Sequence, residues 1–297
     1  MRKAADSYLE RLAMSEVTTF NWTIDQDLAS YARHGFPGIE IWLNKAARNG
    51  AAYDTLPQGD FDARTIDELA HDLNDAGLQA VSVVCAGGLT ESDTRGRQER
   101  IAHLRSTVEF AAKIGASCVL VVPGDLQGAS RSASVKRTTS AIREGLADAH
   151  KYSIDLAIEP LRPVHTDFVN TLPQALEIVT AVDDPRCGVC MDTFQVWRGN
   201  QESDRVLHEI REAGPHTQIV QVADSRVEPR SKEDRLVPGE GVLPLAEMLG
   251  GLFSTGYDGW LAVEIMSTEL WAINYDLLLE RCRTGMEAVI TTATARS

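Results

Sequence analysis

Eight short apolar runs recur along the chain, and each is followed by a segment with helical periodicity. The runs are rich in Val, Ile, Leu and Ala and hold few polar residues, which is typical of strands buried on both faces of a parallel sheet. The predicted strands are residues 16–20, 38–42, 79–85, 117–122, 155–159, 188–192, 219–224 and 260–265. Helices are expected after these strands, at roughly 24–34, 65–75, 95–114, 132–152, 172–182, 203–213, 243–254 and 275–290.

Eight strand–helix units in 297 residues fit an α/β protein of the (β/α)₈ TIM barrel type, as a single domain spanning residues 1–297. The alternative is an open, doubly wound sheet, which usually carries a glycine-rich phosphate loop after its first strand. Here the first predicted strand is followed by NWTID, which contains no glycine. The barrel is therefore favoured, and the absence of any break in composition indicates one domain.

The composition narrows the class of protein. A formal net charge of −14 opposes binding to nucleic acid, because phosphates require Lys and Arg. No stretch is apolar enough for a signal peptide, and none approaches the roughly 20 apolar residues of a membrane span. The five cysteines are irregularly spaced, and the CxxC formed by Cys187 and Cys190 has no second pair, so buried thiols are favoured over a zinc or redox site. We expect a cytoplasmic protein.

Four polar residues stand at the ends of the last four predicted strands. They are Glu159 in LAIEPLRP, Asp192 in CGVCMDTF, Gln221 in IVQVADSR and Glu264 in WLAVEIMS. A buried carboxylate is costly unless it is compensated, and three converging carboxylates repel one another unless a cation lies between them. One such residue could merely cap the next helix, but catalytic groups of TIM barrels lie at these strand ends. The pattern predicts a divalent metal site at one rim of the barrel.

The same segments resemble a known group. IEP after the fifth strand, MDTF after the sixth, RLVPGEG after the seventh and GYDGWLAVEI at the eighth are similar to the xylose isomerase-like TIM barrel superfamily, the sugar phosphate isomerases and epimerases. The resemblance implies that Glu159 and Glu264 bind one divalent ion, Mn²⁺ first and Mg²⁺ or Co²⁺ as alternatives, and also form the proton-transfer pair. Asp192 would be a further ligand. The endonuclease IV-like branch is disfavoured, because its metal cluster needs several histidines and this rim offers one.

Two positions depart from the pattern of the ketose 3-epimerase branch. Its metal-binding histidine on the seventh strand corresponds here to Gln221, whose amide oxygen suits Mn²⁺ or Mg²⁺ better than Zn²⁺. Its histidine three residues after the aspartate corresponds to Gln195, which the resemblance places against the substrate. Arg235 matches an arginine that contacts substrate oxygens in that branch.

The loop after the fifth strand carries two further candidates. His165 is either a histidine on a surface loop or a general base or substrate contact that titrates near neutral pH. Arg162 either binds a carboxylate or phosphate of the substrate or is a solvated side chain. Both interpretations stay open at this point for each residue.

Aromatic residues follow the first two predicted strands. Trp22 and Trp42 could wall a sugar pocket, with ordinary packing as the alternative. Glu40 is expected to point out of its strand and has no assigned role. Asn200 is expected in a turn, and Gly50 lies in a predicted loop.

These groups support proton abstraction next to a carbonyl, through an enediolate stabilised by the metal. Returning the proton gives an epimerase or isomerase acting on a small sugar or keto-sugar. Expelling a β-substituent instead gives a lyase or dehydratase on a keto-sugar or 3-oxo-glycoside, resembling inosose dehydratases or C-glycoside deglycosidases, with His165 as acid and a small partner subunit. A non-catalytic sugar-binding barrel is the third alternative. The resemblance also implies a homo-oligomer.

Overall fold

The structure is a computed structural model, and it describes residues 2–46, 63–199, 203–232 and 234–295. The predicted turn at Asn200 and the predicted loop around Gly50 lie outside these residues.

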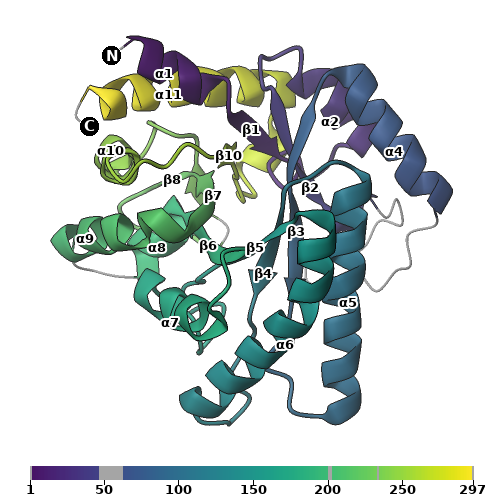
Figure 1. Cartoon of the computed structure of the whole chain (residues 1–297). Coiled ribbons are helices and arrows are strands. Elements are labelled where there is room, and N and C mark those ends of the chain that lie inside the picture. The colour runs from purple at the N-terminus through teal and green to yellow at the C-terminus, as the bar shows by residue number, and fades with distance from the viewer. Residues whose placement is uncertain (1, 47–62, 200–202, 233, 296–297) are drawn as a thin grey trace.

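Eight parallel strands close into a barrel, which confirms the predicted fold class (Figure 1). Around the barrel the order is β1-β10-β7-β6-β5-β4-β3-β2, so each strand pairs with its predecessor and successor along the chain. The barrel strands are β1 Leu12–Ser15, β2 Gly38–Trp42, β3 Gln79–Gly87, β4 Cys118–Val122, β5 Asp155–Ile158, β6 Cys187–Asp192, β7 Thr217–Val222 and β10 Leu261–Val263. A small antiparallel hairpin, formed by β8 Asp224–Ser225 and β9 Arg235–Leu236, follows β7.

Helices surround the barrel, and their apolar faces pack on the outward side chains of the strands. They are α1 Arg2–Leu9, α2 Ile24–Tyr31, α3 Leu43–Ala46, α4 Ala63–Ala76, α5 Thr94–Lys113, α6 Arg131–Tyr152, α7 Leu172–Val182, α8 Thr193–Gly199, α9 Ser203–Ala213, α10 Leu245–Phe253 and α11 Tyr275–Thr294, with short 3₁₀ turns at Gly214–His216 and Leu270–Ala272. Helix α1 lies beside α11, so the two ends of the chain meet on one side of the barrel (Figure 1). No helix in the described ranges is both long and apolar enough to cross a bilayer.

The first strand was predicted in the wrong place. The prediction put it at residues 16–20, whereas β1 is Leu12–Ser15, paired with both β10 and β2. The β-branched residues of VTTF suggested a strand, but the chain turns there, and the Thr18 N–H donates to the Ser15 carbonyl at 3.0 Å. Strand propensity is weak beside pairing, and residues 12–15 are the ones that pair with both neighbours.

The barrel interior is filled by a plug of apolar side chains. Its members are Ala13, Val81, Val84, Cys118, Leu120, Ala157, Cys190, Ile219 and Ala262, with the ring of Trp260 packed against them. A Cβ built on Gly38 would lie 2.7 Å from Trp260 Cζ3, so glycine makes room for that ring. Since side chains alternate along a strand, the residues two positions after Ala157, Cys190, Ile219 and Ala262 also face inward, one step closer to the rim.

Candidate active site

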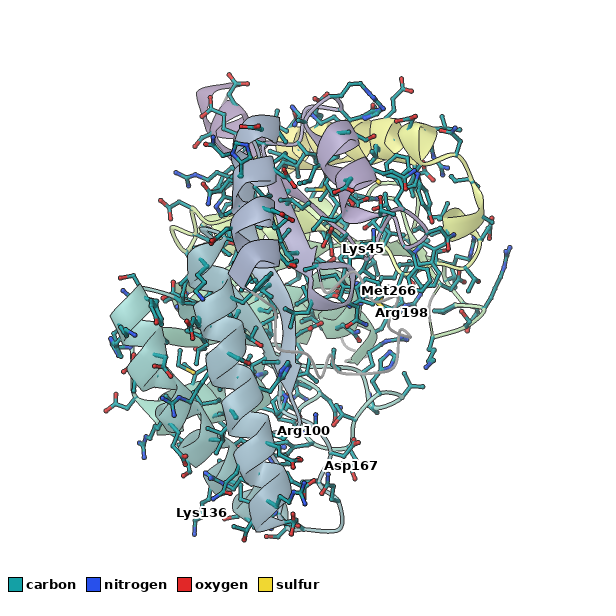
Figure 2. The ribbon with its side chains drawn as sticks, turned by 90° about the vertical axis from the view of Figure 1, so that its right-hand side faces the viewer. Lys45, Arg100, Lys136, Asp167, Arg198 and Met266 are labelled. Carbon is teal, nitrogen blue, oxygen red and sulfur yellow. The ribbon has the colours of Figure 1, made fainter. Side chains whose placement is uncertain are left out.

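Those next inward positions are occupied by Glu159, Asp192, Gln221 and Glu264, from β5, β6, β7 and β10 or directly after them. Asp192 and Gln221 are fully buried, and the two glutamates are about 5% exposed. The structure therefore brings together the four residues predicted for the strand ends. Figure 2 shows the molecule with its side chains, turned by 90° from the view of Figure 1. Three labelled residues, Lys45, Arg198 and Met266, follow β2, β6 and β10 and lie toward the same side of the barrel in this view.

Asp192 links the barrel to the short helix that follows it. Its Oδ1 accepts hydrogen bonds from the backbone N–H groups of Phe194, at 2.7 Å, and Gln195, at 3.0 Å, which caps the start of α8. Among the described residues no group donates a well-aligned hydrogen bond to Oδ2, although Arg235 Nη1 lies 2.9 Å from it as an ion-pair partner. One buried oxygen of Asp192 thus retains acceptor capacity.

Arg235 lies within the acidic cluster rather than above it. It belongs to β9, and its Nη1 pairs with the carboxylates of both Asp192 and Glu264 and donates to the Glu264 carbonyl at 3.1 Å. Its side chain is 3% exposed. The β8–β9 hairpin folds this guanidinium over the barrel end, where it offsets part of the negative charge.

Gln221 presents its amide nitrogen to two carboxylates. Its Nε2 donates to Glu264 Oε1 at 3.0 Å and to Glu40 Oε1 at 2.9 Å, and its Oε1 faces the Cys190 thiol at 3.6 Å. This amide orientation is consistent with its partners, because the two carboxylates beside the nitrogen accept hydrogen bonds and the thiol beside the oxygen donates one. Ligation of an ion through Oε1 would require the amide to turn.

The prediction that Glu40 points out of its strand was wrong. It faces the barrel interior, is fully buried and accepts hydrogen bonds from Gln221 and, at 2.7 Å, from Ser82 Oγ. In a strand buried on both faces, alternation alone does not distinguish an inward polar residue from an outward one. The one available signal was its spacing two residues before Trp42, a predicted pocket residue.

Burial and mutual repulsion govern the titration of these carboxyl groups. The pKa of Glu159 is raised well above its usual range by burial first, and then by the negative charges of Glu264 and Asp192. Burial raises the pKa of Glu264 to about 7, although the positive charge of Arg235 opposes the shift. Burial also raises the pKa of Glu40. Both causes follow from the position of these carboxylates together in one buried, poorly solvated space.

Gln195, Arg162 and His165 form a second layer above the acids. Gln195 Oε1 accepts from Arg162, at 3.1 Å from the backbone N–H and 3.2 Å from Nε. Arg162 Nη2 donates to the Lys232 carbonyl at 2.9 Å and lies 3.3 Å from His165 Nε2. The guanidinium of Arg162 stacks 4.6 Å from the ring centre of Phe194, so it is held in the structure rather than solvated.

His165 lies in a positively charged environment. Burial, together with the positive charges of Arg162, Arg235 and Lys232, lowers the pKa of this histidine to about 4. The imidazole is therefore neutral at neutral pH, well outside the titration range of an isolated histidine. A neutral ring can accept a hydrogen bond or contact a substrate.

The two predicted tryptophans lie in different surroundings. Trp42 follows Glu40 on the inward face of β2, and its ring centre is 5.6 Å from that of Phe20, which stacks on Trp271 at 4.5 Å. Its backbone N–H donates to the buried Glu16 carboxylate at 2.7 Å. Trp22 instead packs edge-on against Tyr275 at the start of α11. Trp42 thus extends an aromatic surface at the β1–β2 side of the rim.

The donor set fits a hard divalent cation. Carboxylate and amide oxygens are the ligands that Mg²⁺ and Mn²⁺ favour, and Asp192 Oδ2 is a buried acceptor with spare capacity. As the side chains stand, no three histidine, cysteine, aspartate or glutamate side chains within the described residues are grouped closely enough to hold an ion. Arg235 now pairs with two of the carboxylates, so Glu159, Asp192 and Glu264 would have to draw together around a cation.

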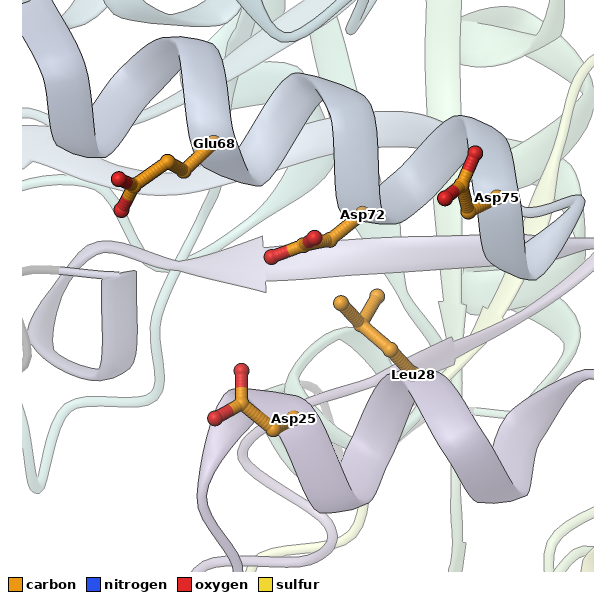
Figure 3. A pocket seen from close by; sticks show the side chains of 5 residues that line it. All are labelled: Asp25, Leu28, Glu68, Asp72 and Asp75. Carbon is orange, nitrogen blue, oxygen red and sulfur yellow. The ribbon is translucent and has the colours of Figure 1, made fainter.

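A second acidic region lies away from the strand ends. A hollow of about 510 Å³ lies between α2 and α4. Figure 3 shows the side chains that line it: Asp25, Leu28, Glu68, Asp72 and Asp75. Its carboxylates come from the outer helices α2 and α4, whereas the polar cluster inside the barrel comes from the strands and their ends.

The barrel and its inward carboxylates can be compared with known proteins. A model of the xylose isomerase-like TIM barrel family matches residues 28–281. The chain belongs to this family. An inosose isomerase of Bacillus velezensis is 25% identical over 288 residues, which cover 95% of this chain and 97% of that relative.

Two other relatives of this xylose isomerase-like chain extend the comparison. A D-psicose 3-epimerase of Ruminiclostridium cellulolyticum is 27% identical over 129 residues, covering 43% of this chain and 40% of that enzyme. The crystal structure of the IOLI protein, which carries a zinc atom, superposes with a TM-score of 0.82 at 22% identity and covers 95% of this chain and 98% of that one. The structural similarity confirms the fold, and the two enzymes named above are a sugar isomerase and a sugar epimerase.

Proposed function

We propose that this protein is a divalent-metal-dependent sugar isomerase or epimerase that acts by proton abstraction next to a carbonyl. The observation that carries the proposal is the convergence of Glu159 and Glu264, inside one end of the barrel, with Asp192 in the same buried space. Similarity to inosose isomerases over nearly the whole chain supports it.

Glu159 and Glu264 are the proposed acid–base pair. They come from β5 and β10, on different sides of the barrel end, so one can remove a proton from a carbon next to a carbonyl and the other can return it. Return to the opposite face of the same carbon gives epimerisation, and return to the neighbouring carbon gives isomerisation. Burial excludes water that would compete for the proton.

The proposed ion ligands are the carboxylates of Glu159, Asp192 and Glu264, with Gln221 as a fourth ligand once its amide oxygen turns toward them. Bound Mn²⁺, or Mg²⁺ or Co²⁺ in its place, would supply Lewis-acid stabilisation of negative charge on the substrate oxygens. Arg235 lies next to the same carboxylates and is proposed to bind substrate oxygens.

The substrate is proposed to be a small keto-sugar held between two walls. Gln195, Arg162 and His165 supply hydrogen-bonding groups on the side of β5 and β6, and Trp42 supplies an apolar face on the side of β2. Trp22 is a more distant candidate because it packs on α11. We also propose a cytoplasmic homo-oligomer that binds neither nucleic acid nor membranes.

Deuterium exchange tests the proposed reaction. The protein is incubated in D₂O with Mn²⁺ and an inosose or a set of ketohexoses, and the sugars are followed by NMR. Deuterium at the carbon next to the carbonyl, with a new epimer or isomer, supports the proposal, and Glu159→Gln and Glu264→Gln should abolish both. Glu109→Gln, on the exposed face of α5, is the matched control. Release of water or an aglycone would identify a lyase, and no exchange with any sugar would indicate a binding barrel.

Ion dependence is tested by thermal unfolding after treatment with EDTA. Adding Mn²⁺ at 100 times its dissociation constant should stabilise the protein by about 2.7 kcal/mol. Asp192→Asn should remove most of that gain, whereas Glu109→Gln should keep it. An unchanged melting temperature in the wild-type protein would reject the metal site.

A further inference from the structure

The buried carboxylate of Glu40 is absent from the roles proposed above, although it is bonded to the acidic cluster. Ser82 lies directly across from it in the β2–β3 pairing and donates to its Oε2 at 2.7 Å. Gln221 Nε2 donates to its Oε1 at 2.9 Å. Both oxygens of Glu40 are therefore engaged, and the side chain is held from two strands.

The bond between Glu40 and Gln221 crosses the inside of the barrel. Strands β2 and β7 are not neighbours, since β1 and β10 lie between them in the closed sheet. The same Gln221 nitrogen donates to Glu264 Oε1 at 3.0 Å. An amide nitrogen carries two hydrogens, so one points to Glu40 and the other to the proposed proton-transfer carboxylate.

A carboxylate is a costly choice for this position if it serves only to fill space. Buried ionic groups can often be replaced by apolar residues of similar volume at little cost in stability, or with a gain. A carboxylate that holds a second side chain in one orientation is a different case, because such supporting groups strongly affect the sites they orient.

We propose that Glu40 is a positioning residue of the active site: it anchors the amide nitrogen of Gln221, which orients the Glu264 carboxylate here and leaves the amide oxygen as the group that turns toward an ion. The expected effect of Glu40 on the reaction rate rests on the proposed function. Its effect on the orientation of the Gln221 amide rests only on the observed hydrogen bonds. Glu40 has no contact with substrate in this role; it determines how Gln221 is presented.

Three variants separate this role from a structural one. Glu40→Ala removes the acceptor for the Gln221 amide. Glu40→Gln keeps an oxygen for that amide, while Ser82 can accept from the new NH₂ group. Glu209→Ala, which removes a buried carboxylate from α9 in the outer layer, is the matched control. If Glu40→Ala does not fold, Glu40→Met, which fills the space, takes its place.

Kinetics with the exchanging sugar give the first measurement. Glu40→Ala should lower kcat about 10- to 100-fold with little change in KM, in the range seen for supporting groups of metal sites. Glu40→Gln should restore most of the activity, Glu209→Ala should keep it, and Gln221→Ala should add little further loss in the Glu40→Ala background. Wild-type kcat in folded Glu40→Ala, or equal losses in both Glu40 variants, would overturn the proposal.

NMR of the side-chain amide of Gln221 gives a second measurement that needs no substrate. Its two NH₂ signals, assigned by their loss in Gln221→Ala, should be protected from exchange with water in the wild type and in Glu40→Gln. In Glu40→Ala the protection should fall. If it does not fall, the positioning role is wrong even where the sugar reaction is confirmed. If it falls in a protein that processes no sugar, the positioning role holds and the proposed reaction fails.

Discussion

At the scale of single residues, the site depends on groups that are costly alone and stable together. Arg235 pairs with the buried carboxylates of Asp192 and Glu264, and Gln221 donates to those of Glu40 and, again, Glu264. Each of these side chains would be strongly unfavourable in the core without its partners. Changes at these positions should therefore affect both stability and reactivity.

Replacement of Arg235 should expose this dependence. Arg235→Met leaves Asp192 and Glu264 buried without their cation, and removing one member of a buried pair typically costs about 3–5 kcal/mol. The free energy of unfolding in urea should fall by that amount. Arg281→Met, which breaks the more exposed pair with Glu240, should cost less than about 1 kcal/mol. Similar losses in the two variants would contradict the account of Arg235.

The titration of His165 is a second residue-scale prediction. Its folded-state pKa of about 4 lies below the ordinary value of 6.5, so the unfolded chain binds more protons between these two pH values. This histidine should therefore lower stability as the pH falls from about 6.5 to about 4. NMR of its ring protons should show a midpoint near 4, and Arg162→Leu should move that midpoint upward. A midpoint near 6.5 in the wild type would contradict the positive surroundings.

At the scale of elements, local signals placed most helices correctly. Thr23 is the N-cap at the start of α2, where its side chain and that of Gln26 bond reciprocally to the backbone. Thr171 is the N-cap of α7, but in the described part of the chain its hydroxyl makes no cap hydrogen bond. Helix α8 was not predicted, because its seven residues are too few to show a period.

The two threonine caps offer a matched pair of substitutions. Thr23→Ala should lower the free energy of unfolding by about 1 kcal/mol, the usual value for a bonded N-cap. Thr171→Ala should change it by less than about 0.5 kcal/mol, because no side-chain cap bond is lost. Urea titrations of the two variants give the comparison. If both variants lost the same free energy of unfolding, the side-chain hydrogen bond at the cap would not explain the contribution of these threonines to stability.

At the scale of the whole molecule, closure of the barrel depends on small residues in its interior. The ring of Trp260 occupies space beside Gly38, next to Val81 and Ala13. The apolar plug inside the barrel is therefore tightly packed. The polar residues at the next inward positions pack directly against this rigid layer.

Gly38→Ala should disturb the packing of this apolar plug. The new methyl carbon would lie 2.7 Å from Trp260 Cζ3 and 2.8 Å from Val81 Cγ1, and overpacking of a core typically costs about 1–3 kcal/mol. Gly251→Ala is the control, because its nearest neighbour lies at 3.7 Å and alanine favours the helix α10. Thermal unfolding should therefore show a loss for the first and a small gain for the second. Higher melting temperatures for both variants would mean that the barrel interior accommodates an extra methyl group without strain.

Much of the architecture was predictable from the chain alone. Runs of apolar residues separated by helical periods led to the barrel, and the rule that barrel sites lie at strand ends placed Glu159, Asp192 and Glu264 at one rim. The start of β1 was missed because its four residues give too short a signal, and VTTF carried a stronger one. Glu40 was missed because both faces of a barrel strand are buried.

The sequence by itself determined the number and order of the strand–helix units and the polar residues at the ends of the last four strands, since these depend on local periodicity. Tertiary structure decided which polar groups meet: Glu40 reaches Gln221 across the barrel, and Arg235 returns from a hairpin to pair with Asp192 and Glu264. The physical reason is that a buried charge is stable only beside its partner, and these partners come from strands and a hairpin that only closure of the barrel brings together.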